Sequence, residues 1–131
     1  AYPRSNAAVF ASYRLGNLYF KVNRYDEAIG FYNQYLEKAS RNNDLTTLVL
    51  SALGASYESK KDLKKALEYY EKAIITPADN GFVAVNYQNA ARIYEEMNNK
   101  AKALEYYKKA LAITVDPSAE LLIKRKIALN S

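Results

Sequence analysis

A threefold repeat is the feature that most constrains what this 131-residue chain can fold into. The same four positions recur with identical spacings. Each copy has a small residue, a tyrosine three positions later, an alanine nine positions after that and a tyrosine four positions beyond the alanine. The three copies are Gly16…Tyr19…Ala28…Tyr32, Gly54…Tyr57…Ala66…Tyr70 and Ala91…Tyr94…Ala103…Tyr107. Agreement at every step indicates one structural unit used three times, which buries its apolar surface by stacking on its neighbours.

Each unit is predicted to be a pair of antiparallel helices. In the first half of the unit, apolar residues recur at steps of three and four, as in Leu15, Leu18 and Val22, which is the period of a helix with one buried side. In the second half, a small alanine followed one turn later by a tyrosine suits two closely packed helices. We expect first helices at about 7–22, 45–60 and 82–97, and second helices at about 25–41, 63–75 and 100–114.

Short polar turns are predicted between the two helices of each unit, at residues 23–24, 61–62 and 98–99. Asn23 and Asn98 tolerate the left-handed backbone that ends a helix. Asp62 can cap the helix that follows it, because its carboxylate can accept from the free backbone N–H groups of the first turn.

The C-terminal segment lacks the repeat signature. Asp116 and Pro117 offer a helix start, since proline is well tolerated at the first helical position. The predicted helix then has an apolar stripe, which consists of Ala119, Leu122, Ile123 and Ile127. The basic residues opposite this stripe are Lys124, Arg125 and Lys126. We predict a helix at about 117–129 that caps the third unit, with the start of a fourth repeat as the alternative.

The sequence resembles the tetratricopeptide repeat family over about residues 7–115. The motifs that carry the resemblance are L-G-x-x-Y followed by D-E-A-I-x-x-Y in the first unit, and K-A-L-E-Y-Y-E-K-A-I and K-A-L-E-Y-Y-K-K-A-L in the second and third. The resemblance implies an all-α fold, a right-handed α-solenoid with units at about 7–41, 45–76 and 82–115, as part of a longer repeat protein. The period of 38 and then 37 residues exceeds the family's ~34, which places extra residues around 42–44 and 77–80, at one edge.

The resemblance also implies a non-enzymatic scaffold whose first helices line a concave groove that binds a peptide or helix of a partner protein. Aligning the units predicts the groove residues, which are Phe10, Tyr13, Asn17, Phe20 and Lys21 in the first unit, Leu48, Ser51, Ala52, Ala55 and Glu58 in the second, and Val85, Gln88, Asn89, Arg92, Glu95 and Glu96 in the third. One end of this groove is aromatic and basic, and the other is mixed and acidic. For Phe10 and Phe20, packing against an upstream repeat is an equal alternative.

Co-chaperone members of the family hold a partner's C-terminal carboxylate with lysine, asparagine and arginine side chains. The matching positions here are Tyr13, Asn17, Ala52, Val85 and Asn89, of which only Asn17 agrees. Because paired cations compensate a desolvated carboxylate, we expect no such clamp in these three units.

Composition argues against an enzyme. The chain has no Cys and no His, which excludes thiol nucleophiles, imidazole acid–base catalysis and zinc sites built from those ligands. Its four scattered glycines cannot form a phosphate-binding loop, so no cofactor and no metal are expected. The carboxylates that remain for acid–base chemistry are Glu58, Asp62, Glu95 and Glu96, and the adjacent Glu95 and Glu96 point about 100° apart on a helix. No apolar run is long enough for a membrane span.

The net charge of +5 does not predict a nucleic-acid surface. The lysines of the second helices are interleaved with glutamates, as in Glu68 and Lys72 or Glu105 and Lys109, which is typical of a solvated outer face. A protein partner is therefore expected, and nucleic acid is not.

Self-association is the alternative function. Phe31, Tyr69 and Tyr106 share one repeat position beside the core tyrosines, and we hypothesise that they form an exposed aromatic line for a partner or a second copy. The junction that begins at Tyr2 is similar to that of bacterial envelope proteins with these repeats, which suggests a periplasmic assembly module, with the cytoplasm as the alternative location.

Overall fold

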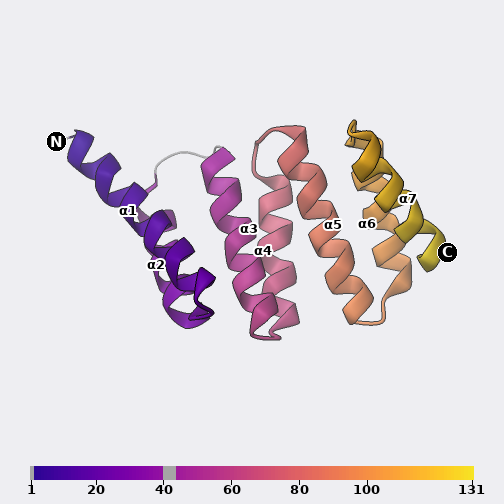
Figure 1. Ribbon diagram of the computed structural model, residues 1–131, viewed down its shortest axis with the longest axis horizontal. Helices are drawn as coiled ribbons and strands as arrows, with labels where there is room; N and C mark the ends of the chain where they lie inside the picture. The colour runs from indigo at the N-terminus through magenta and orange to yellow at the C-terminus, as the bar shows by residue number, and fades with distance from the viewer. Residues whose placement is uncertain (1, 40–43) are drawn as a thin grey trace.

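The computed structural model describes the backbone of residues 2–39 and 44–131, with side chains from residue 7 onward, and seven helices lie in a row in chain order over this range (Figure 1). They are α1 (Tyr2–Lys21), α2 (Tyr25–Lys38), α3 (Asp44–Ser59), α4 (Leu63–Ile75), α5 (Asn80–Glu96), α6 (Lys100–Ile113) and α7 (Pro117–Asn130). Three antiparallel pairs form, α1 with α2, α3 with α4 and α5 with α6, and each second helix also packs on the next first helix. The predicted all-α solenoid is confirmed. Over the same range, no helix is long and apolar enough to cross a membrane.

The connections between units follow the prediction where the structure describes them. The loop between α4 and α5 covers residues 76–79, close to the extra residues predicted at 77–80. The Asp79 backbone N–H in that loop donates to the Asp44 carboxylate at the start of α3, at 3.1 Å, which ties this edge together. At the other end of the chain, α1 starts at Tyr2, about five residues before the expected start. The other predicted insertion, at residues 42–44, lies between the first two units, and its residues 42 and 43 are outside the residues that the structure describes.

The turn inside each pair has one geometry in all three units. Asn23, Lys61 and Asn98 adopt φ angles of 65°, 66° and 60°, the left-handed conformation. The backbone N–H of the following residue then donates back across the helix end, from Arg24 to the Tyr19 carbonyl at 2.9 Å and equivalently in the other two units. Asp62 caps α4 by accepting from the Lys65 backbone N–H, as predicted. Asn99 caps α6 in the same way, since its side-chain oxygen accepts from the Lys102 backbone N–H.

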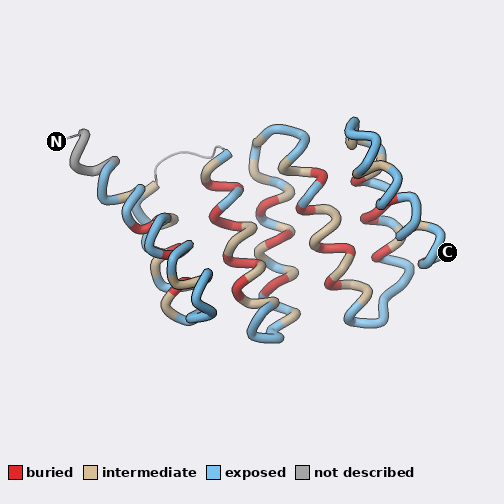
Figure 2. The backbone as a smooth tube through the Cα atoms, viewed as in Figure 1, coloured by how far each residue is buried: buried red, intermediate tan, exposed pale blue. Residues whose placement is uncertain are grey.

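A close approach between helices forms the core of the first two pairs. The rings of Tyr32 and Tyr70 lie directly against Gly16 and Gly54, so closely that an added Cβ would come within 2.6 Å of either ring. The alanine one turn before each core tyrosine is fully buried in all three units. Figure 2 shows that buried positions recur along the helices. The buried side chains join into clusters that bridge neighbouring pairs.

The predicted aromatic line is wrong at Tyr106. Phe31 and Tyr69 are half-buried and stack on Tyr19 and Tyr57, with ring centroids 5.4 Å and 5.5 Å apart. Tyr106 instead packs edge-on against Tyr94, is 9% exposed, and donates its hydroxyl to Glu71 of α4 at 2.6 Å. The three side chains therefore form no continuous exposed aromatic surface.

α7 packs on the third pair with most of the predicted apolar stripe, but not with Leu122. Asp116 caps it by accepting from the Ala119 backbone N–H at 2.9 Å, as expected from the sequence. Ile123 is buried and Ile127 half-buried, but Leu122 is exposed, which corrects its place in the apolar stripe. The inner face includes the predicted Ile123 and Ile127 and continues to Asn130, which is buried and was not predicted.

The close approach predicts opposite effects for two glycine substitutions. Gly54→Ala forces a methyl group against the Tyr70 ring and should lower the free energy of unfolding by about 1–3 kcal/mol. Gly30→Ala is the matched control, because an added Cβ there meets nothing within 4 Å, and it should raise that free energy by about 0.5–1 kcal/mol. Urea denaturation followed by circular dichroism measures both, and a shift of the same sign in the two variants would refute the interlock.

Candidate binding face of the first helices

The predicted groove residues lie on the solvent side of α1, α3 and α5. In α3, Leu53 and Gly54 are buried towards the neighbouring helices, while Leu48, Ser51 and Ala55 are at least partly exposed on the opposite side. We call the side of α1, α3 and α5 that carries the predicted groove residues, together with the adjoining side of α7, the first-helix face.

A hollow of about 300 Å³ opens on this face between α1 and α3. Six predicted groove residues from two units line it together with one residue that the prediction did not include, Tyr32; the six are Asn17, Phe20, Leu48, Ser51, Ala52 and Ala55. The hollow is largely apolar, with the side chains of Asn17 and Ser51 as its polar groups.

Tyr32 reaches this face from the second helix. Its ring passes against Gly16, and its hydroxyl donates to Asn17 Oδ1 at 2.6 Å. Burial raises the pKa of Tyr32 to about 12, so the hydroxyl stays protonated and acts as a donor at neutral pH. The core tyrosines of the other units do the same, since Tyr70 donates to Glu58 at 2.8 Å and Tyr107 to Glu95 at 2.9 Å.

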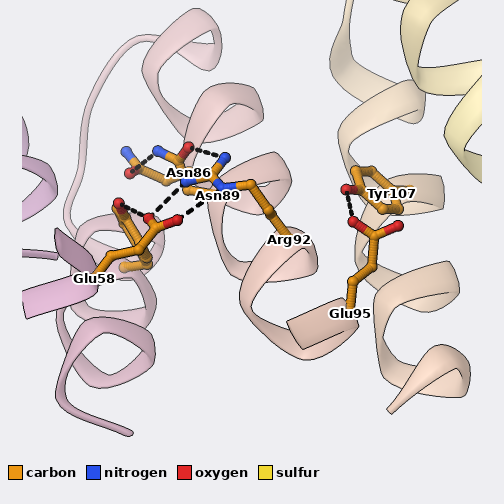
Figure 3. Close-up of polar contacts among 7 residues, drawn as sticks. Glu58, Asn86, Asn89, Arg92, Glu95 and Tyr107 are labelled. Atoms are coloured by element: carbon orange, nitrogen blue, oxygen red, sulfur yellow. Dashed lines mark hydrogen bonds and ion pairs between the residues drawn. The ribbon is translucent and has the colours of Figure 1, made fainter. Parts of the chain in front are cut away.

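An ion pair joins α3 to α5 at the centre of the face (Figure 3). The Arg92 guanidinium donates twice to the Glu58 carboxylate, at 2.7 Å and 3.0 Å, and once to Asn89 Oδ1 at 3.0 Å. Asn89 in turn donates to the buried Asn86 at 3.5 Å. Burial raises the pKa of Glu58, but the hydrogen bonds from Arg92 and Tyr70 outweigh it, so that pKa lies below its usual value.

α7 completes the polar contacts at the other end. Asn130 donates to Glu95 at 2.8 Å and Lys126 pairs with the same carboxylate at 3.5 Å. Burial raises the pKa of Glu95, and the bonds from Asn130, Tyr107 and Lys126 lower it further than burial raises it. Lys126 therefore does not lie on a purely solvated side of α7, and the end of the groove predicted to be acidic is partly neutralised by Arg92 and Lys126.

A second hollow, of about 470 Å³, lies between α5 and the connection from α6 to α7. The predicted groove residues Val85 and Gln88 line it. The remaining lining comes from residues that the repeat alignment does not cover or places elsewhere, namely Asp79, Asn80, Gly81, Ala84, Ile113, Thr114, Val115, Asp116 and Ala119. Their signal in the sequence was weak because they belong to turns and helix ends rather than to the repeated motif.

Most of the other predicted residues do not line either hollow. Phe10 and Lys21 are exposed, and Tyr13 is half-buried with its ring 6.3 Å from that of Tyr35. Phe20, besides lining the first hollow, packs edge-on against Tyr25 at 5.4 Å within its own unit. Glu96 is exposed at the end of α5.

The two central carboxylates on this face, Glu58 and Glu95, have lowered pKa values. A general acid at neutral pH needs a raised pKa, whereas the hydrogen bonds to Glu58 and Glu95 lower theirs. Asp62 is used as a helix cap. In the part of the chain that the structure describes, no group of three Asp, Glu, His or Cys side chains is placed to hold a metal ion.

Comparison with protein families agrees with this architecture. A tetratricopeptide repeat family model matches residues 6–74, more than half of the chain, and a second tetratricopeptide repeat model matches residues 84–114. The chain belongs to the tetratricopeptide repeat family.

Known tetratricopeptide repeat (TPR) proteins share this fold with little sequence identity. The TPR2AB domain of yeast Sti1, solved as a complex with pHSP90, superposes with a TM-score of 0.79 at 20% identity, covering 95% of this chain and 46% of that one. The first TPR domain of Spaghetti, bound to the HSP90 peptide SRMEEVD, gives 0.71 at 19% identity and covers 95% of both chains.

A relative in sequence is anaphase-promoting complex subunit 3 of Schizosaccharomyces pombe. It is 35% identical to this TPR chain over 63 residues, which are 48% of the chain and 9% of the relative. The match therefore covers less than a tenth of the length of that protein.

The central ion pair of this TPR face predicts a pH-dependent stability. Glu58→Gln should lower the free energy of unfolding by about 1 kcal/mol near pH 7. This effect is smaller than for a fully buried ion pair, because Arg92 is partly exposed to solvent. Because the folded pKa of Glu58 lies below 4.5, its contribution is complete above about pH 4.5 and is lost as the pH falls through the folded value. The penalty measured by urea denaturation should therefore shrink at about pH 3.

Glu68→Gln is the control for this prediction. Glu68 pairs with Lys72 at 3.4 Å on the exposed surface of α4, and its loss should change stability by less than about 0.5 kcal/mol. An equal penalty for Glu58→Gln at both pH values would show that its ion pair does not contribute.

Proposed function

We propose that this chain is a non-enzymatic scaffold that binds a segment of a partner protein on its first-helix face. The observation that carries the proposal is the pair of hollows on that face, one between α1 and α3 and one beside α5 and α7. Concave, mostly apolar sites with a few placed polar groups are the usual form of a ligand site. The pHSP90 complex of Sti1 and the HSP90-peptide complex of Spaghetti, which share the fold, support a protein segment as the partner.

We further propose that binding does not depend on a partner's terminal carboxylate. Of the five positions used by carboxylate-binding relatives, Asn17 accepts from Tyr32 and Asn89 accepts from Arg92, and none of the five is a cation. Arg92 is close to this site, but its guanidinium is already paired with Glu58. A free carboxylate would have to compete with that pair.

The outer surface of the second helices does not favour nucleic acid. Lys72 pairs with Glu68 at 3.4 Å, and Lys102 and Lys109 pair with Glu105 at 3.6 Å and 3.3 Å. Phosphate binding requires cations that are not already compensated. A protein partner is therefore the better proposal for this chain.

Self-association is the second candidate, and a separate surface favours it. On the outer side of α1, Leu15, Leu18 and Val22 are exposed. Leu53 in α3 and Ala90 in α5 match Leu15 in the repeat, and both are fully buried against the preceding second helix. A preceding repeat or a second copy would cover this side of α1 in the same way, and a second copy would make the chain an assembly module. The envelope location suggested by the sequence belongs to this candidate.

A charge placed in the first hollow tests the proposed function. Ala55→Arg should fill the hollow between α1 and α3 and weaken partner binding at least tenfold, because Ala55 lines it without holding another side chain. Ala112→Arg, the same change at an exposed position of α6, should leave the affinity for the partner unchanged. The measurement is affinity capture from a lysate, followed by titration of the purified partner and thermal melts of both variants.

Two results would count against binding at this face. Equal affinity of wild type and Ala55→Arg would contradict it. Binding that survives Ala55→Arg but is lost in Leu18→Ser would place the partner on the outer side of α1 instead.

A further inference from the structure

The outer side of α1 is exposed where the matching sides of the other first helices are buried. α1 lies at one end of the row of helices (Figure 1), and an apolar stripe runs along it at steps of four, three and four residues, through Ala11, Leu15, Leu18 and Val22. Leu18 and Val22 are 61% and 62% exposed. The residues of α3 and α5 that match the first three members of the stripe are at most 2% exposed, and they are Val49, Leu53, Ser56, Asn86, Ala90 and Ile93.

A second helix covers the matching side in the later units. α2 packs on α3, and α4 packs on α5. Ile29 and Leu36 of α2 pack against the buried cluster that contains Val49 of α3. Leu67 and Ile74 occupy the same repeat positions in α4 and pack against the cluster that contains residues of α5. By analogy, the outer side of α1 suits a helix that presents aliphatic side chains seven residues apart.

Two cations border the apolar stripe of α1. Arg14 lies four residues before Leu18 and Lys21 three residues after it, so both are neighbours of Leu18 on the helix surface. Both are exposed, and neither forms an ion pair with a residue that the structure describes. α1 itself contains no acidic residue. We call Arg14 and Lys21 the basic edge of α1.

The first helices that are covered within the chain have no such edge. At the two matching positions, α3 has Ala52 and Ser59, and α5 has Asn89 and Glu96. The second helices that pack on α3 and α5 therefore meet no cation there. A helix that covers α1 meets two, and acidic side chains on that helix would complement them.

Charge argues against a second copy as the occupant of this side. A two-fold interface uses the same patch on both subunits, so the basic edge of one α1 would approach the basic edge of the other. At the other end of the row, α7 exposes Leu121 and Leu129, but it carries three basic residues and one acidic residue. Neither surface of a second copy supplies the acidic groups that the basic edge lacks.

We propose that the outer side of α1 binds an amphipathic helix of another protein, whose apolar stripe covers Leu15 and Leu18 and whose acidic side chains pair with the basic edge. The bound helix takes the place that α2 has on α3 and that α4 has on α5. Leu15 and Leu18 do not line the hollow between α1 and α3, so this inference does not rest on binding at the first-helix face.

The test is selection from a displayed library of helices about 20 residues long, long enough to be helical alone. A leucine stripe is fixed in every member, and the positions beside it vary among glutamate, lysine and glutamine. The chain should select helices with glutamate beside the stripe. Leu15→Ser with Leu18→Ser should weaken their binding by about tenfold or more, because two leucine side chains are no longer buried. Leu121→Ser with Leu129→Ser, the matched change on α7, should leave the affinity unchanged.

Charge reversal provides a second arm that alters only exposed side chains. Arg14→Glu with Lys21→Glu should reverse the selection, so that lysine replaces glutamate beside the leucine stripe. Lys64→Glu with Lys108→Glu, the same change on α4 and α6, should leave the preference for glutamate intact. Ala55→Arg, which fills the hollow between α1 and α3, should not affect the selected helices.

Several outcomes would overturn the inference. They are a library without enriched helices, equal enrichment of lysine and glutamate, and undiminished binding to Leu15→Ser with Leu18→Ser. Loss of binding in Ala55→Arg would move the helix to the first-helix face, where the proposed function would still stand. A dimer of the free chain in sedimentation velocity that only Leu15→Ser with Leu18→Ser dissociates would assign this side to a second copy. If the selected helices fail to bind the longer repeat protein predicted from the sequence, a preceding unit of the same chain is the occupant and the inference is wrong.

Discussion

The close approach of a tyrosine ring to a glycine in the first helix is the contact on which the rest of the structure depends. Gly16 and Gly54 let the rings of Tyr32 and Tyr70 lie against the helix backbone, and the hydroxyls then emerge on the first-helix face. There they hold Asn17 and Glu58, and Glu58 holds Arg92 of the next first helix. Packing within a pair, contact between pairs and the polar groups of the binding face are therefore one connected set of interactions.

The repeat spacing predicts most of this arrangement because the relevant contacts are local and occur three times. The buried alanines, the turn at Lys61 and the cap at Asp62 all follow from residues that lie within one unit. The exposed side of α3 and α5, including Ser51 and Gln88, follows from the resemblance to the family, whose first helices line a groove, together with the alignment of the units.

The features that sequence reasoning missed depend on contacts between units. Tyr106 is buried because Tyr94 and Glu71 surround it, and Glu71 belongs to the preceding unit. α7 has no repeat motif to set its rotation, so the side that it buries is decided by how it packs on the third pair, which leaves Leu122 exposed and brings Lys126 to Glu95. Periodicity within a helix fixes the width of its apolar stripe more reliably than it fixes which stripe meets a neighbour.

The proposed function requires that partners bind on the first-helix face. This requirement can be tested by recording amide chemical shifts of the ¹⁵N-labelled chain during titration with the purified partner. Binding on this face should shift the resonances of Ser51, Ala55 and Gln88 and leave those of Lys64 and Lys108, on the second helices, unchanged. Shifts confined to the second helices would contradict it.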